Sequence, residues 1–268
     1  MIRSMTETGT EGSLMKEIEM EGKVKLKAGE RIDDLQLSGL KIIQDPSRFC
    51  FGMDAVLLSG FVKAKEGANI LDIGTGTGIL PLLLSAKTKA AHITGLEIQE
   101  ESAEMAERSL KLNSDILNGR LDIVRGDIKE AGKLFAPASF EVICCNPPYK
   151  KAGSGIINPH DAKAVARHEI YCTFDDIAKQ AYMLLKGGGK LFIVHRPERL
   201  PELCITLSKR RLEVKRMRFV YPFADREPEM VLIEAAKDGK SGMKAEKPLI
   251  IYESEGVYSA EIKRDYGF

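Results

Sequence analysis

Two short stretches of the sequence combine residue types that could carry out chemistry, and each follows an apolar run. The first is Asn146-Pro147-Pro148-Tyr149, which comes directly after residues 142–145. Its Asn146 side-chain oxygen and Pro147 carbonyl are neighbouring acceptors, which could bind both hydrogens of an amine on an aromatic ring. Such an amine is planar and weakly nucleophilic because its lone pair is delocalised into the ring. Holding both hydrogens would draw the nitrogen towards a tetrahedral shape and direct its lone pair at an electrophile.

The rest of this tetrapeptide supports the same chemistry. Tandem prolines restrict the backbone, so that the preceding carbonyl keeps its direction. Tyr149 would stack on a flipped or unpaired base. We therefore predict that Asn146, Pro147, Pro148 and Tyr149 are the catalytic residues. The alternative interpretation is a rigid turn without chemistry.

The second stretch is a glycine loop, Gly74-Thr75-Gly76-Thr77-Gly78, preceded by Asp72. Its spacing differs from the Gly-x-Gly-x-x-Gly pattern that holds a pyrophosphate. A carboxylate at Asp72 would also repel a pyrophosphate, whereas it would attract a cationic ligand. S-adenosylmethionine is such a ligand, because its amino group and its sulfonium are both positive. The alternative is a tight turn that binds nothing.

Two further acids strengthen the prediction of this cofactor. Glu97 follows the next apolar run, where a carboxylate can accept both hydroxyls of a ribose. Asp127 follows a third run and could accept from an adenine amino group. Each acid alone could be an exposed residue or a helix cap, but three acids at successive strand ends favour a methyl-donor site. The predicted contacts with S-adenosyl-L-methionine also include the loop glycines, the residues after these acids and the catalytic asparagine: Gly74, Gly76, Gly78, Ile98, Ile128 and Asn146.

Alternating strand and helix signals would place these residues at one edge of a sheet. Apolar runs predict strands at 70–73, 92–96, 121–124, 141–145 and 191–194. Helical periodicity predicts helices at 55–62, 79–87, 100–113, 174–185 and 201–211, with Gly187, Gly188 and Gly189 ending the fourth. Such alternation indicates a parallel sheet covered by helices on both faces. Ligands bind beyond the carboxyl ends of strands in such sheets.

The last two predicted strands, 214–220 and 230–235, are joined by too few residues for a helical crossover. A short connection fits an antiparallel pair at the sheet edge. The sequence therefore predicts an α/β, Rossmann-like fold with a seven-stranded, mostly parallel sheet and an antiparallel last strand. That is the pattern of class I S-adenosylmethionine-dependent methyltransferases.

The two ends of the chain differ from this central region. We expect residues 1–32 to be a flexible tail, 33–236 to be the methyltransferase domain, and 237–268 to be a linker and a C-terminal hairpin extension. Within the extension, 248–252 and 257–262 would form the hairpin. Residues 35–43 predict a short strand or hairpin near the start of the domain.

Composition sets the expected surroundings. The chain has 268 residues, 44% of them hydrophobic, without an apolar run of the roughly 20 residues that cross a bilayer. The first residues do not resemble a secretory signal. The cysteines lack Cys-x-x-Cys spacing and His168 and His195 are isolated, so we expect free thiols and no metal. A cytoplasmic protein without membrane contact, monomeric in preference to oligomeric, is the expectation.

One segment is strongly basic although the whole chain carries a net charge of only +1. Residues 186–220 hold ten Lys or Arg and three Glu, so that 10 − 3 = +7. Such a segment could bind phosphates. The alternative is a solvated helix end followed by the exposed face of a strand.

The motifs together resemble a known group, the amino-methyltransferases with an Asn/Asp-Pro-Pro-Tyr/Phe motif. Within that group the chain resembles the bacterial tRNA (adenine-N6) methyltransferases that modify adenosine 37, beside the anticodon of a valine tRNA. The resemblance spans about residues 33–235. It is carried by residues 49–58 (FCFGMDAVLL), 72–78, Glu97, 146–149, and the loop with Asn158-Pro159 and Ala166-Arg167-His168-Glu169.

This resemblance implies an enzyme that transfers a methyl group to the exocyclic N6 of an adenine in tRNA. It implies that Phe51 and Asp54 lie over the methionine end of the cofactor. It also implies that residues 150–169 shape the target pocket. In this loop we expect the basic side chains to contact the substrate, namely Lys150, Lys151, Arg167 and His168. The alternative for residues 167–169 is a helix start with a local ion pair.

Other acceptors fit the same chemistry. A protein glutamine amide is also planar and weakly nucleophilic, but glutamine N5-methyltransferases usually carry a helical domain before the catalytic one. Here about 65 residues precede the glycine loop, without a helical-bundle pattern. DNA adenine or ribosomal RNA methylation fits equally well and differs only in the flanking stretches. A non-enzymatic RNA-binding module is disfavoured by the intact tetrapeptide.

Overall fold

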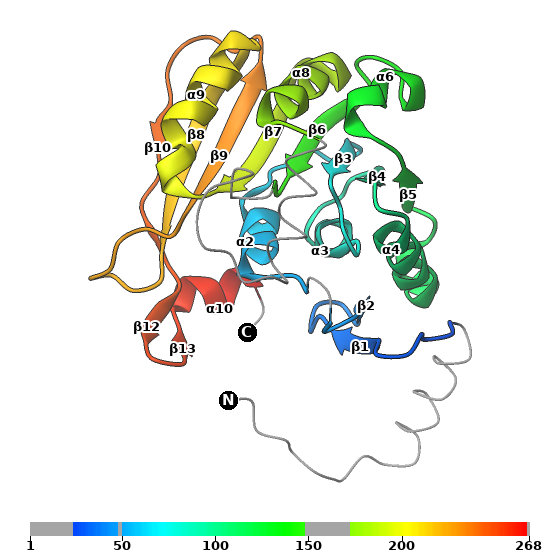
Figure 1. Cartoon of the computed structure of the whole chain (residues 1–268). Coiled ribbons are helices and arrows are strands. Elements are labelled where there is room, and N and C mark those ends of the chain that lie inside the picture. Colours follow the sequence, from blue (N-terminus) through cyan, green and yellow to red (C-terminus); the bar gives the residue numbers. More distant parts are fainter. Residues whose placement is uncertain (1–23, 48–49, 148–171, 267–268) are drawn as a thin grey trace.

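A mostly parallel sheet forms the centre of the protein, with helices on both faces (Figure 1). The computed structural model describes residues 24–47, 50–147 and 172–266. Five strands run parallel: β3 (Asn69–Ile73), β4 (His92–Glu97), β5 (Leu121–Arg125), β6 (Phe140–Cys145) and β7 (Leu185–His195). β9 (Met230–Lys237) is antiparallel to β7 and to β8 (Leu212–Tyr221). The order β5-β4-β3-β6-β7-β9-β8 confirms the predicted fold class.

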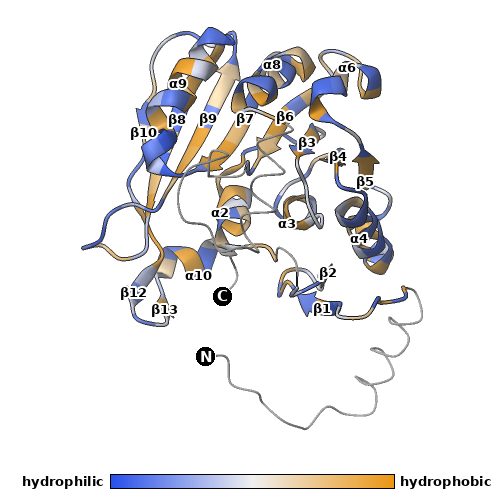
Figure 2. Cartoon of the chain, in the orientation of Figure 1, coloured by the Kyte–Doolittle hydropathy of each residue, from blue (hydrophilic) through white to orange (hydrophobic). Residues whose placement is uncertain are grey.

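The two faces of the sheet follow from alternation along each strand. On β3, Ile70 belongs to the apolar cluster with α2 (Met53–Phe61) and α3 (Ile79–Lys87). Its neighbour Leu71 belongs to the opposite cluster, with α8 (Phe174–Leu184) and α9 (Leu200–Lys209). Because successive side chains of a strand point to opposite faces, a continuous apolar run fills both layers. Figure 2 shows the resulting apolar strands beneath helices with polar outer faces.

The remaining elements are short, apart from α4 (Glu100–Leu112) beside β4 and β5. α5 (Ser114–Leu117) follows α4, and the η1 turn (Ile128–Glu130) and α6 (Ala131–Leu134) follow β5. A second turn, η2 (Pro197–Arg199), precedes α9. Within the described ranges, no helix is both long and apolar enough to cross a membrane.

The prediction that three glycines end the helix at 174–185 is wrong. α8 ends at Leu184, and β7 begins at Leu185, so the glycines lie inside the strand. Phe140 of β6 pairs with Leu185, but Val142 pairs with Lys190, so four residues of β7 (186–189) lie opposite one residue of β6 (Glu141). A Cβ on Gly189 would lie 3.1 Å from the Glu141 carbonyl. Glycine therefore permits a bulge pressed against the neighbouring strand.

The C-terminal residues extend the sheet, and their hairpin is shorter than expected. β10 (Lys244–Ala245) and β11 (Leu249–Ile250) both pair in parallel with the outer side of β8. The hairpin itself comprises only β12 (Tyr252–Ser254) and β13 (Val257–Tyr258), and Ala260–Tyr266 forms α10. Ile251 and Ile262 are buried in the same apolar cluster as α2. Burial of these side chains, which local patterning does not reveal, fixes the segment against the core.

A hairpin precedes α2, but its first strand lies before the predicted residues 35–43. β1 (Arg31–Asp34) pairs antiparallel with β2 (Lys41–Gln44). The hairpin lies against α4, where Asn113 accepts from the Lys41 backbone N–H at 2.8 Å and donates to the Lys41 carbonyl at 2.6 Å. The Ser109 hydroxyl accepts from the Ile43 backbone N–H at 3.0 Å. These contacts fix the hairpin to the helix that follows β4.

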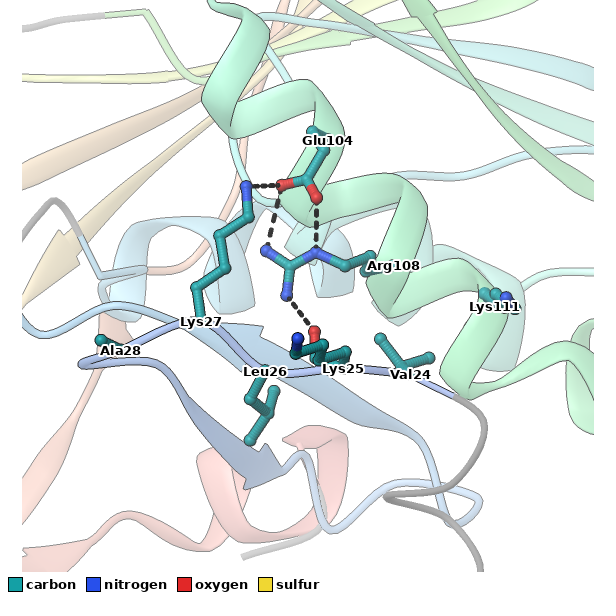
Figure 3. A pocket seen from close by; sticks show the side chains of 8 residues that line it. All are labelled: Val24, Lys25, Leu26, Lys27, Ala28, Glu104, Arg108 and Lys111. Carbon is teal, nitrogen blue, oxygen red and sulfur yellow. Dashed lines mark hydrogen bonds and ion pairs between the residues drawn. The ribbon is translucent and has the colours of Figure 1, made fainter.

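An ion-pair group fastens the residues before this hairpin to α4. The Arg108 guanidinium donates to both carboxylate oxygens of Glu30 and also pairs with Glu104. Glu104 forms a second ion pair with Lys27. A hollow of about 640 Å³ lies between residues 24–28 and α4 (Figure 3). Two of its four lining cations, Lys27 and Arg108, form ion pairs with Glu30 or Glu104 of the protein itself. We therefore assign the hollow to the packing of the N-terminal segment against α4.

A buried ion-pair group on the opposite side joins the outer strands to α2. The Arg216 guanidinium bonds Glu234 at 2.7 Å and the Phe61 carbonyl at 2.7 Å, and it lies over the Phe61 ring. Burial alone would raise the pKa of Glu234, but Lys190 and Arg216 together hold it below its usual value. The group therefore links β7, β8, β9 and the end of α2.

Replacing Arg216 with Ala should destabilise the protein by about 3 kcal/mol, because Glu234 and the Phe61 carbonyl would lose a buried partner. Chemical denaturation measures this free energy of unfolding. Arg211→Ala is the matched control, since that side chain is 70% exposed in its ion pair with Asp238. It should change stability by less than about 1 kcal/mol. Equal losses for the two variants would show that the Arg216 group does not stabilise the sheet.

Candidate active site

The carboxyl ends of three adjacent strands bring the predicted acids and the catalytic motif to one edge. Asp72 on β3 pairs with Gly95 on β4 and with Cys144 on β6. Glu97 is the last residue of β4, and Asn146 follows the last residue of β6. Parallel pairing in this register therefore places the three polar side chains along a single edge, as the sequence predicted.

The glycine loop after β3 has a backbone that requires glycine. The φ angles are +72° at Gly74, +57° at Gly76 and +85° at Gly78. A Cβ at Gly74 or Gly76 would meet nothing within 4 Å, so these residues border open space. A Cβ at Gly78 would lie 3.2 Å from that of Ala106 on α4. The first two glycines thus leave room for a ligand, and the third allows α3 and α4 to pack closely.

The carboxylate of Glu97 is fixed by this loop. Its Oε2 accepts from the Gly76 backbone N–H at 2.9 Å, and its Oε1 accepts from the Gln99 N–H at 2.8 Å. The residue is 2% exposed. A carboxylate has about four acceptor positions, so two remain for hydroxyl groups of a ligand. The adjacent Ile98 is 39% exposed and offers an apolar surface at the same edge.

Asp72 lies beneath the loop and is almost fully buried. Burial raises the pKa of this carboxyl to about 7, and the negative charge of Glu97 adds to the rise. The Thr75 hydroxyl is close enough to counter part of this effect, although it does not reach hydrogen-bond geometry. A cation beside Asp72 would favour its ionised form. The site therefore suits a positively charged ligand.

Asp127 lies at the end of β5, where it caps the η1 turn. Its Oδ1 accepts from the Lys129 backbone N–H at 2.8 Å, so the helix cap considered as an alternative is present. The Lys129 ammonium lies 3.8 Å from Oδ2. The next residue, Ile128, is buried in the core. Asp127 thus has a structural role, and its contact with adenine stays a prediction.

Asn146 and Pro147 leave β6 beside the glycine loop. Cys145 on β6 pairs with Ile73 on β3. Asn146 and Gly74 are the next residues of the two strands, so they leave the sheet side by side. Asn146 is partly buried and Pro147 is buried. The other predicted catalytic and substrate-binding residues lie outside the described part of the chain: Pro148, Tyr149, Lys150, Lys151, Arg167 and His168.

The start of α2 also reaches this edge. α2 is followed by a short connection to the amino end of β3, so it runs opposite to β3 and begins near the glycine loop. Phe51 packs against an apolar cluster that includes Ala55 and Ile79, the first residue of α3. Asp54 lies in the first turn of α2. The predicted contacts Phe51 and Asp54 therefore belong to the region around the loop.

From the sequence, His195 was judged too isolated to be a metal ligand. It ends β7, the strand next to β6, and is 2% exposed. Its Nδ1 accepts from the Arg196 backbone N–H at 2.8 Å. Burial, followed by the charge of Arg199, lowers its pKa to about 4. At neutral pH this side chain is therefore uncharged, and its other ring nitrogen, Nε2, carries the proton. In the sequence, its place at the end of a predicted strand was the indication that it lies at this edge.

The basic segment 186–220 is largely engaged within the protein. Seven of its ten cations form ion pairs with carboxylates: Lys186, Lys190, Arg199, Arg210, Arg211, Arg216 and Arg218. Lys215 and Arg196 donate to backbone carbonyls. The local charge count overstates the phosphate-binding capacity, because all of these acids except Glu202 lie outside the segment.

The donor set fits S-adenosylmethionine. Its two positive groups match a buried carboxyl with a raised pKa, and its ribose hydroxyls match the remaining acceptor positions of Glu97. The positive φ and open side of Gly74 and Gly76 allow the backbone to approach a ligand. The residues present would therefore hold this cofactor.

Comparison with known proteins agrees with the fold. Residues 41–205 match the methyltransferase small domain family. A tRNA1(Val) (adenine(37)-N6)-methyltransferase of Porphyromonas gingivalis is 30% identical, covering 80% of this chain and 85% of that protein. One of the same name from Vibrio parahaemolyticus is 32% identical, covering 79% and 84%.

Solved structures show the same fold. A predicted O-methyltransferase from Agrobacterium tumefaciens has a TM-score of 0.66 at 22% identity, covering 80% of this chain and 96% of that one. P. horikoshii TYW2 in complex with MeSAdo has a TM-score of 0.55 at 14% identity, covering 80% and 73%.

The sheet order and the family match together define an S-adenosylmethionine-dependent methyltransferase of class I. The chain belongs to the methyltransferase small domain family, among relatives that carry the name tRNA1(Val) (adenine(37)-N6)-methyltransferase. It is an S-adenosylmethionine-dependent N-methyltransferase.

Asp72 should make the stability depend on pH. Its pKa is about 7 in the folded protein and near 3.8 when unfolded, so the folded state binds more protons between these values. Stability should therefore fall as pH rises through this window. Asp72→Asn lacks this titrating group. Its free energy of unfolding relative to wild type should therefore rise by about 2.5 kcal/mol between about pH 5 and pH 8. Denaturant unfolding at both pH values measures the change, and a constant difference would contradict a raised pKa.

Proposed function

We propose that this enzyme transfers a methyl group from S-adenosylmethionine to the exocyclic N6 of an adenine in tRNA, at position 37 of a valine tRNA. The observation that carries the proposal is the position of Asn146 and Pro147 at the end of β6, beside the glycine loop of β3. The acceptor is supported by the relatives named for that nucleotide.

The chain's own residues would activate the adenine amine. The Asn146 side-chain oxygen and the Pro147 carbonyl would each accept one hydrogen of the amine, which reduces delocalisation of its lone pair. Pro147 is buried, and its ring restricts the backbone, so the carbonyl keeps its direction without reorganising during the reaction. Tyr149 would stack on the base and hold its ring in place.

The other strand ends would hold the cofactor. When bound, S-adenosylmethionine supplies an electrophilic methyl group on a sulfonium. Asp72 would favour its positive charge, Glu97 would accept from its ribose, and Asp127 would accept from its adenine amine. The residues at the start of α2, Phe51 and Asp54, would cover its methionine end. A strong general base is unnecessary, because the methylated nitrogen is a strong acid and loses its proton readily.

Contacts with the tRNA backbone are proposed for the loop after the motif rather than for the basic segment. The cations of residues 186–220 are mostly engaged by carboxylates and carbonyls of the protein itself. Lys150, Lys151, Arg167 and His168 follow the motif in sequence and would meet phosphates near the target base. A glutamine acceptor is less supported, because the relatives at about 30% identity are named for a tRNA acceptor.

Asn146→Ala should lower turnover by about 10²–10³-fold, because the amine would lose one of its two acceptors. The dissociation constant for the cofactor should change by less than about threefold. Asn146→Asp is the matched control, since it keeps an acceptor oxygen at the same place and should retain measurable turnover. Single-turnover kinetics and calorimetric cofactor titration give the two quantities. A large loss of cofactor affinity in Asn146→Ala would contradict the catalytic role.

The acceptor class can be tested directly with labelled cofactor. Purified enzyme would be incubated separately with total tRNA, ribosomal RNA, DNA and a protein extract. We expect label in tRNA, recovered on digestion as N6-methyladenosine. Label only in protein would favour glutamine methylation, and label only in ribosomal RNA or DNA would favour those acceptors. Each of these results would reject the proposed acceptor while leaving the methyl-donor site intact.

A further inference from the structure

Gln44 is a buried polar residue outside the strand-end site. It is the last residue of β2 and is 2% exposed. Its side-chain nitrogen donates to Asp33 Oδ2 at 2.8 Å, and its side-chain oxygen accepts from the Phe51 backbone N–H at 3.1 Å. A single side chain therefore bridges the N-terminal hairpin and the residue that precedes α2 by two positions.

The segment that Gln44 holds leads directly to the glycine loop. Phe51 packs against the cluster that contains Ile79, which follows Gly78 in sequence. α2 runs opposite to β3, so its first residues lie near the carboxyl end of that strand. A displacement of Phe51 would therefore be transmitted to the start of α2, at the edge where Asp72 and Glu97 lie.

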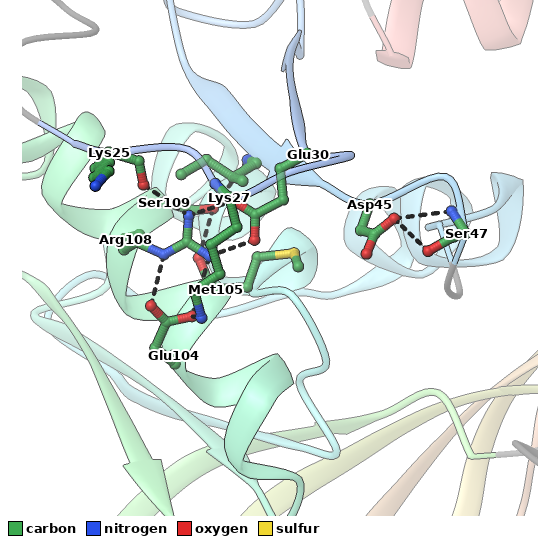
Figure 4. Close-up of polar contacts among 10 residues, drawn as sticks. Lys25, Lys27, Glu30, Asp45, Ser47, Glu104, Met105, Arg108 and Ser109 are labelled. Atoms are coloured by element: carbon green, nitrogen blue, oxygen red, sulfur yellow. Dashed lines mark hydrogen bonds and ion pairs between the residues drawn. The ribbon is translucent and has the colours of Figure 1, made fainter.

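The connection between β2 and α2 also has contacts within itself, among them the Cys50 thiol, which donates to the Asp45 carbonyl oxygen at 3.7 Å. Figure 4 shows a turn at its start, where Asp45 Oδ1 accepts from the Ser47 backbone N–H at 2.9 Å and from its hydroxyl at 2.7 Å. This turn acts within the connection and does not reach α2. At the far end, the Phe51 N–H bonds to Gln44. Because a part-buried N–H without a partner is costly, this bond favours one position of Phe51.

The hairpin that carries Gln44 is itself fixed. The Asp33 carboxylate also accepts a hydrogen bond from Arg31. Ser109 of α4 and Asn113 at its end accept from backbone N–H groups of β2. α4 follows β4, the strand that ends at Glu97. The hairpin therefore gives Gln44 a rigid support that is tied to the same strand as the ribose-binding acid.

We propose that Gln44 is a positioning residue for the methyl donor: it holds Phe51 and the start of α2 at the cofactor edge through its bond to the N-terminal hairpin. The amide is required because it donates at one end and accepts at the other, which a carboxylate or an apolar side chain does not do. The role rests on the proposed placement of Phe51 and Asp54 over the cofactor. It does not depend on which acceptor is methylated.

A charge-exchange set of variants separates this role from general stability. Gln44→Glu places a second carboxylate against Asp33 and should weaken S-adenosylmethionine binding about tenfold. Asp33→Asn with Gln44→Glu restores a donor facing an acceptor, and its dissociation constant should return to within about threefold of wild type. Gln44→Met removes both hydrogen bonds at similar volume and should also bind about tenfold more weakly. Gln36→Glu makes the same chemical change at an exposed position of the same hairpin and should bind normally.

Two measurements on the full chain decide the outcome. Calorimetric titration gives the dissociation constant for S-adenosylmethionine, and amide exchange of Phe51 reports its hydrogen bond in the protein without cofactor. We expect faster Phe51 exchange in Gln44→Glu and Gln44→Met, and slow exchange again in the double variant. Should Gln44→Glu fail to fold, Gln44→Met carries the test. Binding within twofold of wild type in a folded Gln44 variant would overturn the proposal, as would a double variant without recovery.

Discussion

The whole site depends on the pairing of β3 with β4 on one side and with β6 on the other. Each ladder fixes which residues leave the sheet together, so a shift of one residue would exchange the faces of Asp72 and its neighbours. Parallel strands also end at the same edge, which is why an acid, a glycine loop and the Asn146 motif meet there. The chemistry is thus a consequence of register, and the apolar clusters on both faces hold that register in place.

The sequence predicted the central elements well because their signals are local. Continuous apolar runs bounded by glycine or polar residues identify buried parallel strands, and α3 occupies the predicted residues 79–87. Prediction from the sequence failed where contacts between residues far apart in the chain decide the structure. Gly187 to Gly189 read as a helix stop, but β6 draws them into a strand. The charge of the basic segment allowed either a phosphate-binding surface or a solvated face, but Glu141, Asp175 and Glu234, far along the chain, pair with several of its cations.

The site itself was predictable to the extent that its residues follow strands. Asp72, Glu97 and Asn146 each come after or within a strand signal, and their types already indicate a cationic ligand and a planar amine. Gln44 has no such signal, since its importance comes from two partners that the fold supplies. The structure also adds to Asp72 what a sequence does not contain, a pKa near neutrality caused by burial.

The pairing of residues 244–250 with β8 bears on how the protein is made. The outer side of β8 would present open hydrogen-bonding groups until these residues leave the ribosome, and Ile251 and Ile262 complete the apolar layer under α2 later still. A nascent chain that already carries the predicted catalytic residues would therefore expose an unprotected strand edge, the kind of surface on which chains associate wrongly. Closure of this edge by residues 244–250 makes that segment a guard against misassembly as well as a part of the sheet.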